Sequence, residues 1–174
     1  MRYLFYIAKA YSIPVIKPLV SRLKTEGKEY GFYISDNAAR NFPDEWDRSR
    51  IFKNLKQAKK FCPDFVLCPG NFVDFRIPGI KVQLFHGLGG EKDVHYDIRH
   101  FFDVYLTSGP YVTERFEILR QKYKYFILLE SGWPKVDYIL NYPADNLKQK
   151  LDIPAGKKII LYAPTFSTKH YIVA

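Results

Sequence analysis

Short apolar runs alternate along this chain with segments whose apolar residues recur at helical spacing, and this alternation constrains the fold more than any other feature. Tyr3–Ala8 is an apolar run, and Ile13–Thr25 follows it with apolar residues three or four positions apart. Gly27 then stands where a helix would end. The same alternation continues, with strands predicted at 30–35, 65–68, 81–85, 104–107 and 125–130 and helices at 51–61 and 110–122. Strands that are apolar on both faces and separated by helices predict an α/β fold with a Rossmann-like, doubly wound parallel sheet.

The end of the chain does not fit this first sheet. Asn141–Leu151 is a polar linker with a short helix, and Lys157–Ala163 is predicted to be a strand. A buried parallel strand needs neighbours on both sides. We therefore expect two parts, an N-terminal domain at 1–142 and, at 143–174, a linker with the first strand of a second, truncated domain. If this strand keeps a free edge, it predicts a homodimer formed by strand addition or exchange.

The composition is that of a globular protein, because 47% of the 174 residues are hydrophobic and 17% are aromatic. No apolar run approaches the about 20 residues that span a bilayer, and the N-terminus lacks a signal-peptide pattern. These features predict a cytoplasmic protein. The spacing of Cys62 and Cys68 suits neither a metal site nor a disulfide scaffold, so we expect two reduced, buried thiols.

The net charge of +9 is concentrated in the first third of the chain. Residues 1–60 hold 13 Lys and Arg against 6 Asp and Glu, whereas the rest of the chain is nearly balanced. A basic region of this kind favours an anionic partner, and lysines 53, 56, 59 and 60 lie on or beside one predicted helix. The alternatives are a peripheral site on the inner face of the membrane and a merely solvated surface. Nucleic acid is not among the expected partners.

Three segments follow predicted strands and therefore lie where parallel α/β sheets bind ligands. They are 86–93, 107–111 and 131–137. His86 leaves its strand directly and can act as a general base near neutral pH. Gly87, Gly89 and Gly90 let backbone N–H groups approach an anion. From the residues alone, the commoner interpretation of such a histidine is a hydrogen bond to a backbone carbonyl, and a tight turn also explains the glycines.

Three motifs in this order carry a family resemblance. The first is Lys81–Gly87, ending in Gln-Leu-Phe-His-Gly, the second is Gly132–Leu140, beginning Gly-Trp-Pro-Lys, and the third is Ile160–Phe166, containing Leu-Tyr-Ala-Pro-Thr-Phe. Together they resemble the CDP-glycerol glycerophosphotransferase family, the group of teichoic-acid primases and polymerases that builds cell-wall and capsule polymers. The chain departs from the family pattern at Leu88, where Thr-Pro is common, and at Lys135, where Arg is common.

The resemblance implies a GT-B fold, of which this chain would be the N-terminal, acceptor-side half, inactive by itself. It implies transfer of glycerol phosphate from CDP-glycerol to a hydroxyl of a polymer or lipid-linked acceptor, with His86 as the base and with neither cofactor nor metal. The expected substrate-binding residues are Gly87, Gly89, Gly90, Lys92, Ser108, Gly132, Pro134 and Asp137. Most contacts to the nucleotide-activated donor would come from the other half.

Two alternatives stay open at this point. A GT-B sugar-nucleotide glycosyltransferase or epimerase would keep the same fold. A non-catalytic basic module would instead bind a membrane or polyanion. His95 and His100 are five positions apart, which is not the spacing of a helical metal site. Asp137 in Pro-x-x-Asp is interpreted as a helix cap, with ligand contact as the alternative, and Trp133 as a core or hinge residue.

Overall fold

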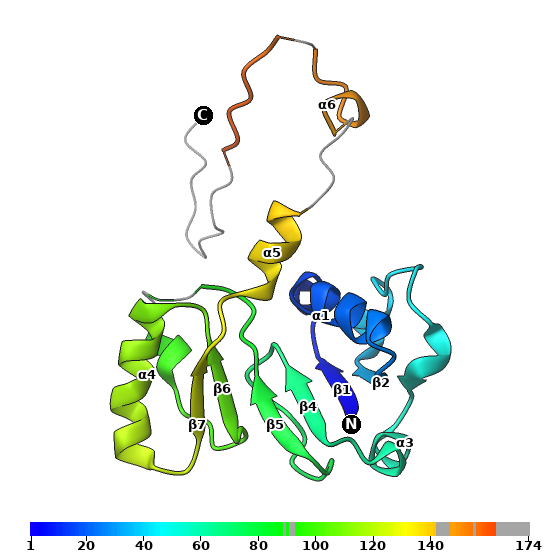
Figure 1. The fold of residues 1–174 in the computed structure, drawn as a ribbon. Helices are drawn as coiled ribbons and strands as arrows, with labels where there is room; N and C mark the ends of the chain where they lie inside the picture. Colours follow the sequence, from blue (N-terminus) through cyan, green and yellow to red (C-terminus); the bar gives the residue numbers. More distant parts are fainter. Residues whose placement is uncertain (89, 91–92, 142–146, 155, 163–174) are drawn as a thin grey trace. The chain divides into compact units, whose positions relative to one another are not determined.

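A computed structural model describes residues 1–88, 90, 93–141, 147–154 and 156–162 (Figure 1). The chain divides into two compact units, Met1–Asn141 and Tyr142–Ala174. The strands of the first unit are β1 (Arg2–Ile7), β2 (Glu29–Ile34), β3 (Ile51–Phe52), β4 (Phe65–Cys68), β5 (Ile80–Gln83), β6 (Val104–Thr107) and β7 (Ile127–Glu130). Its α-helices are α1 (Ile13–Thr25), α2 (Asp36–Ala39), α3 (Leu55–Phe61), α4 (Pro110–Tyr123) and α5 (Pro134–Leu140). Short 3₁₀ turns occur at η1 (Ala10–Ser12), η2 (Arg48–Arg50) and η3 (Asp93–Tyr96).

All seven strands pair in parallel in the order β3-β2-β1-β4-β5-β6-β7. The fold is therefore the predicted α/β, Rossmann-like doubly wound sheet. The chain moves outward from β1 through β2 to β3, and then returns to the other side of β1 with β4. The strand order thus reverses between β1 and β4, which makes the carboxyl ends of these two strands the topological switch point.

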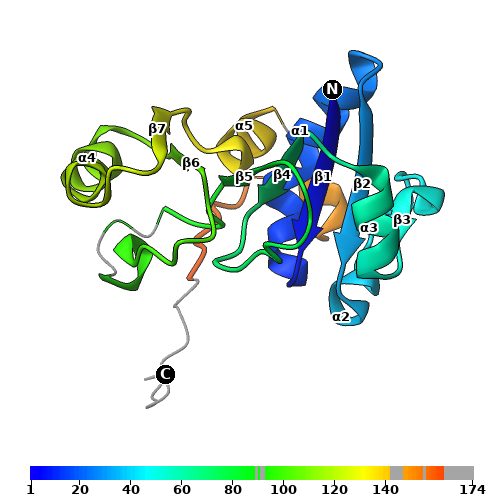
Figure 2. The same cartoon turned by 90° about the horizontal axis from the view of Figure 1, so that it is seen from below.

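Alternate residues of β1 face opposite sides of the sheet and belong to different cores. Phe5 and Ile7 pack with Ile16 and Val20 of α1, whereas Leu4 packs with residues of α3 and α4. Figure 2 shows α1 and α5 on one side of the sheet and α3 on the other. The two faces of the central strands are therefore covered by different helices.

Aromatic rings fill the core beneath α1. Phe32 is fully buried, stacks on Trp46 at a centroid distance of 5.1 Å and meets Phe42 edge to face at 5.1 Å. Gly31 lies beside this cluster, and a Cβ there would come within 2.6 Å of the Phe52 ring. Close packing of rings against backbone therefore holds β2 and β3 in place.

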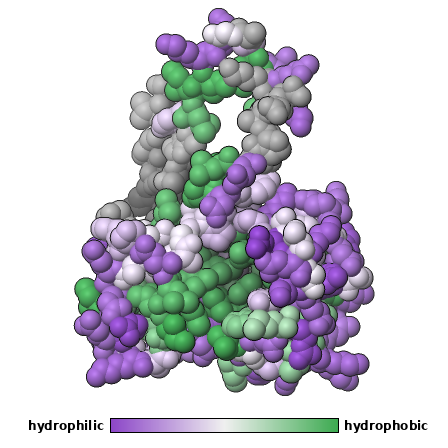
Figure 3. All heavy atoms as spheres, viewed as in Figure 1, coloured by the Kyte–Doolittle hydropathy of each residue, from purple (hydrophilic) through white to green (hydrophobic). Residues whose placement is uncertain are grey.

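The opposite end of the sheet is much less covered. Ile127 and Leu129 of β7 are 58% and 52% exposed, although both lie on a strand that the sequence predicts to be buried on both faces. Figure 3 shows apolar residues gathered on this side of the sheet, below α5. One face of β7 is thus apolar and open.

The structure corrects three local predictions in the first unit. Ile51 does not begin a helix, because Asn54 caps α3 by accepting a hydrogen bond from the Gln57 N–H, and Ile51 pairs instead with Phe32. Residues 36–39, to which the sequence assigned no helix, form α2. Cys62 is exposed rather than buried, since it ends α3 in a left-handed conformation with φ 51°. Cys68 is a buried free thiol, as expected, and burial raises its pKa to about 12.

In the second unit, α6 (Leu147–Lys150) forms the predicted short helix. Residues 157–162 carry no strand, so that prediction is wrong for the residues that the structure describes; Ala163 lies outside them. A strand requires a ladder partner, and none of the described residues pairs with this segment. Ile160 and Leu161 are 93% and 84% exposed. Within the described residues, no helix is long and apolar enough to cross a membrane.

Candidate functional site

The backbone turns sharply where β5 ends, and this turn determines where His86 lies. The Leu84 N–H still donates to the Cys68 carbonyl at 2.9 Å, continuing the pairing with β4. Phe85 then takes a left-handed conformation with φ 56°, and its side chain is buried against Phe116. A bulky residue with positive φ is strained, and such strain is concentrated at functional sites. The consequence here is that the next residue, His86, leaves the sheet at its carboxyl edge.

His86 lies at the switch point itself. Its Nδ1 is 3.0 Å from the carbonyl oxygen of Pro69, which follows β4, and its ring is 4.8 Å from the ring of Tyr11, which follows β1. A carbonyl oxygen can only accept a hydrogen bond, so Nδ1 carries the hydrogen in the neutral ring. Nε2 then has a free lone pair and can accept a proton. The ends of three strands thus orient one potential base.

The glycine loop after His86 is held from the side of α4. The Gly90 carbonyl accepts hydrogen bonds from the Tyr96 hydroxyl and from Arg115, each at 3.0 Å. A Cβ on Gly90 would lie 3.1 Å from the Tyr111 ring, whereas nothing lies within 4 Å of a Cβ on Gly87. Gly89 and Lys92 lie outside the described residues. Arg115 was not predicted, since one arginine within a helix gives no signal of its contacts with a distant loop.

A chain of hydroxyl groups joins the ends of β6 and β7 to α4. The fully buried Thr107 places its hydroxyl 2.7 Å from the Thr113 hydroxyl, which in turn donates to the Glu130 carboxylate at 2.6 Å. Ser108 is half-buried beside them, one residue before Gly109 at the start of α4. Ser108 thus lies at the same edge of the sheet as His86, one strand further along the sheet order.

The Gly132–Asp137 segment begins after β7 and continues into α5. Gly132 has φ 75°, and Pro134 occupies the first turn of α5. Asp137 is not a helix cap, because it lies inside α5, whose N-cap residue is Trp133. Asp137 instead lines a groove along α1. Of the two interpretations of Asp137, contact with a ligand is the one that remains. Trp133 is half-buried, with the Lys135 ammonium 5.4 Å from its ring.

The other two histidines that the structure describes lie in aromatic surroundings. His95 stacks on Phe85 at 4.3 Å, and burial, with a smaller contribution from His86, lowers its pKa. His100 lies 5.3 Å from the ring of Tyr125. Among the residues that the structure describes, no three His, Cys, Asp or Glu side chains are grouped to hold a metal ion.

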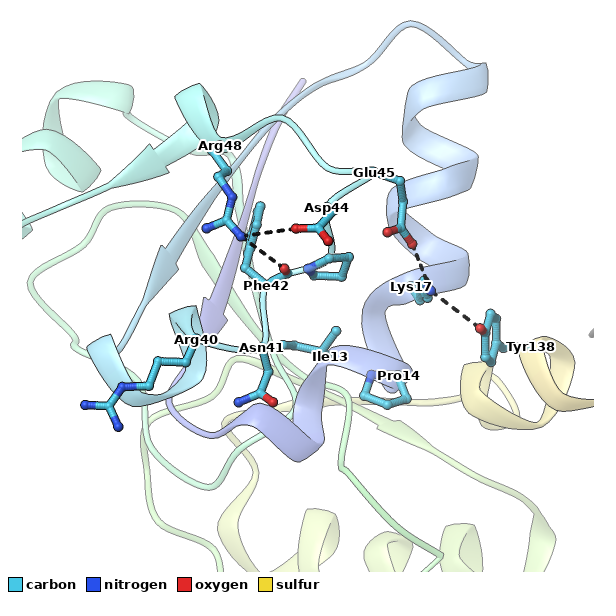
Figure 4. Close-up of a pocket in the computed structure, with 11 residues that line it drawn as sticks. Ile13, Pro14, Lys17, Arg40, Asn41, Phe42, Asp44, Glu45, Arg48 and Tyr138 are labelled. Carbon is cyan, nitrogen blue, oxygen red and sulfur yellow. Dashed lines mark hydrogen bonds and ion pairs between the residues drawn. The ribbon is translucent and has the colours of Figure 1, made fainter. Parts of the chain in front are cut away.

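Two cavities of the first unit lie away from His86, which lines neither of them. One of about 470 Å³ and one of about 840 Å³ lie against α1 and share Lys17, Glu45 and Tyr138 (Figure 4). Lys17 bonds Glu45 at 2.8 Å and the Tyr138 hydroxyl at 3.5 Å. This bond raises the pKa of Lys17 and lowers that of Glu45, so both are charged near neutral pH. The candidate base thus lies at the carboxyl ends of the strands, outside these two cavities.

The comparisons with known proteins agree with the family resemblance. The model of the CDP-Glycerol:Poly(glycerophosphate) glycerophosphotransferase family matches residues 90–173, just under half of the chain. The chain is also 36% identical over 69 residues to a teichoic acid poly(glycerol phosphate) polymerase of Bacillus subtilis (strain 168). This similarity covers 37% of the chain and 9% of that polymerase. No solved structure matches. The predicted resemblance is confirmed, while His86 itself lies just before the segment matched by the family model.

Proposed function

We propose that this chain provides the acceptor side of a glycerophosphotransferase-like enzyme that moves glycerol phosphate from CDP-glycerol to a hydroxyl of a polymer or lipid-linked acceptor. The observation that carries the proposal is the orientation of His86, whose Nδ1 is bonded to Pro69 at the switch point and whose Nε2 is left available. The similarity to the glycerophosphotransferase family supplies the reaction type.

In this mechanism, His86 Nε2 takes the proton from the acceptor hydroxyl as its oxygen attacks the glycerol-bearing phosphorus of CDP-glycerol. A new phosphorus–oxygen bond forms to the acceptor, the bond to CMP breaks, and CMP leaves with the bonding electrons. The imidazolium so formed keeps its Nδ1–H on the Pro69 carbonyl, which stabilises the charged ring. Positioning and electrostatic stabilisation dominate such phosphoryl transfers.

The remaining proposed substrate contacts come from the segments that follow β5, β6 and β7. Gly87 has open space around its Cα, so its N–H can approach a phosphate oxygen. Ser108 belongs to the same edge of the sheet, and Gly132, Pro134 and Asp137 belong to the segment that follows β7. Gly89, Gly90 and Lys92 belong to the same glycine loop and are proposed to contact the substrate with Gly87.

The test is an assay of transfer from labelled CDP-glycerol to a glycerol-phosphate acceptor, in which release of CMP reports turnover, with the protein as it occurs in the cell. His86→Gln should lower turnover by about 10² to 10⁴, the usual effect of losing a general base. His100→Asn is the matched control, because His100 is an exposed histidine with φ 56° and asparagine tolerates that conformation. An effect of His86→Gln below threefold would remove His86 from the mechanism.

The donor distinguishes the alternative reaction. UDP-sugars replace CDP-glycerol in the same assay, with product analysis for both transfer and epimerisation. The proposal expects turnover of CDP-glycerol only. Turnover of a UDP-sugar without CDP-glycerol activity would favour the glycosyltransferase or epimerase.

We also propose peripheral binding to the anionic inner face of the membrane through the lysines beside α3. Lys53, Lys56, Lys59 and Lys60 are all exposed, and basic clusters bind such surfaces. Binding to anionic vesicles should weaken as salt rises, and equal binding to neutral vesicles would contradict a charge-based contact. A homodimer through the exposed apolar segment Ile159–Tyr162 is a further proposal; light scattering that gives a monomer mass would overturn it.

A further inference from the structure

The two cavities against α1 form one groove that follows the helix. The smaller cavity begins at Ile13 and Pro14, and the larger one extends to Gly27 and Lys28 beyond the other end of α1. A helix of this length spans about 20 Å. The opposite walls come from the 40–50 segment and from α5, and the shared residues Lys17, Glu45 and Tyr138 lie in the middle. The groove is thus long, whereas a pocket for one small molecule is compact.

The groove is lined by more cations than anions. Its basic residues are Lys17, Arg22, Lys24, Lys28, Arg40, Arg48 and Arg50, and its acidic residues are Asp44, Glu45, Asp47 and Asp137. Four of the basic side chains are paired with carboxylates: Lys17 with Glu45, Arg22 with Glu26, Arg48 with Asp44 and Arg50 with Asp47.

Three of the lining cations form no ion pair with any described residue, and they lie at the two ends of the groove. Lys24 and Lys28 lie at the end where α1 stops, and Arg40 lies near its start. All three are exposed. In Figure 4, Arg40 extends away from the Lys17–Glu45 and Arg48–Asp44 pairs. Unpaired positive charge therefore lies at both ends of the groove, which suits an extended ligand with several negative groups more than a single phosphate.

One ring contact connects the start of the groove with the proposed base. Ile13 is two residues after Tyr11, and the Tyr11 ring contacts the ring of His86 at 4.8 Å. A chain lying along α1 can therefore bring its end to the switch point. Such a chain would extend from the unpaired lysines at one end of the groove, past Tyr11, to His86.

We propose that the α1 groove binds successive phosphate groups of an extended, phosphodiester-linked polyanion whose terminal hydroxyl reaches His86. The inference rests on the proposed function, since it identifies the acceptor as a polymer held at a distance from the reacting end. Lys17 has a positioning role. Its ammonium group bonds Glu45 of the 40–50 segment and the Tyr138 hydroxyl of α5, and so fixes the position of both walls relative to α1.

The groove is distinct from the lysines proposed to meet the membrane. α1 and α3 cover opposite faces of the sheet (Figure 2), so a flat surface that contacts the α3 lysines leaves the α1 groove free. The two basic regions can therefore be tested against each other with variants of equal charge.

The experiment compares two triple variants, Lys24→Gln/Lys28→Gln/Arg40→Gln in the groove and Lys53→Gln/Lys56→Gln/Lys59→Gln near α3. The probes are a defined-length poly(glycerol phosphate) oligomer, glycerol 3-phosphate and vesicles containing phosphatidylglycerol. The groove variant should weaken oligomer binding roughly tenfold or more and reduce its salt dependence, because three charge contacts are lost. The α3 variant should change oligomer binding less than twofold. All replaced side chains are exposed, so thermal unfolding should stay unchanged and verifies the fold.

Equal weakening by both variants would overturn the proposal, since net charge alone would then explain binding. Glycerol 3-phosphate binding as tightly as the oligomer would also overturn it, and so would vesicle binding lost only in the groove variant. A different result would contradict the proposed function and leave this inference standing. Oligomer binding that depends on the groove, without any transfer from CDP-glycerol, would contradict the enzyme reaction and keep the polyanion site.

Discussion

The two ends of the sheet differ in how they are built. Around β2, the fully buried Phe32 has aromatic rings on several sides, and α1 closes the face of the sheet above it. At β7, Ile127 and Leu129 belong to a strand of similar apolar character, yet more than half of each side chain is exposed. The charge also differs, because most of the net positive charge lies in the first 60 residues, whereas all four histidines follow residue 85.

This difference shows that packing and chemistry are concentrated in different parts of one domain. The β1–β3 end provides a well-packed core, and the β5–β7 end provides His86, the first two motif segments and an open apolar face. His86 lies where the two ends meet, bonded to the loop after β4 and in contact with Tyr11 after β1. The base is therefore oriented by the well-packed end, although the family similarity covers the other.

The largest expected effect is at Phe32. Phe32→Ala should lower the free energy of unfolding by about 3–5 kcal/mol, because it opens a cavity among packed rings. Leu129→Ala should cost less than about 1 kcal/mol, since this side chain is 52% exposed. Urea unfolding of both variants measures the contrast. A cost at Leu129 equal to that at Phe32 would mean that the face of β7 is covered in solution.

A smaller effect is expected at Gly79, where the chain enters β5. Gly79→Ala should cost about 2–4 kcal/mol, because φ is 93° and the new Cβ would lie 2.2 Å from the Pro63 carbonyl oxygen. Gly27→Ala is the control, since φ is also positive but nothing lies within 4 Å. Its expected cost is about 1–2 kcal/mol. Equal thermal unfolding of the two variants would show that the approach of β5 to β4 is loose.

The smallest effect concerns pH and arises at the histidine-bearing end. The pKa of His95 is lowered in the folded state from its ordinary value of 6.5, so the unfolded chain binds more protons below that pH. The stabilisation from neutral His95 is therefore present above pH 6.5 and is lost as the pH falls below it. His95→Phe, which can keep the stack on Phe85, should reduce the slope of stability between pH 7 and pH 5. An unchanged slope, with His100→Asn as the control, would contradict this assignment.

The sequence predicted the regular elements better than their surroundings. The strong periodicity of Ile13–Thr25 predicted α1 with its correct ends, and the apolar runs 65–68 and 104–107 predicted β4 and β6. Ile51 was assigned to a helix because its spacing fits one, but a side-chain cap at Asn54 and pairing with β2 outweigh periodicity. The strand expected at 157–162 failed because a strand also needs a partner, which a local pattern does not provide.

The candidate site was predictable only in its central residue. His86 directly follows an apolar run, and the rule for parallel sheets assigns such a residue to the ligand-binding edge. Tyr11, Pro69 and Arg115 come from distant parts of the chain, and their roles depend on a strand order that no local signal contains. The open face of β7 was missed for the same reason, since an apolar strand does not show whether a helix covers it.

The orientation of His86 is the central claim, and its tautomer tests it most directly. Long-range ¹H–¹⁵N correlation spectra of the labelled chain distinguish the two neutral tautomers, and the signal lost in His86→Gln assigns the residue. Because Nδ1 donates to the Pro69 carbonyl, we predict that neutral His86 carries its hydrogen on Nδ1 and leaves Nε2 unprotonated. A neutral His86 with its hydrogen on Nε2 would contradict the account, because the nitrogen proposed to accept the proton would already be occupied.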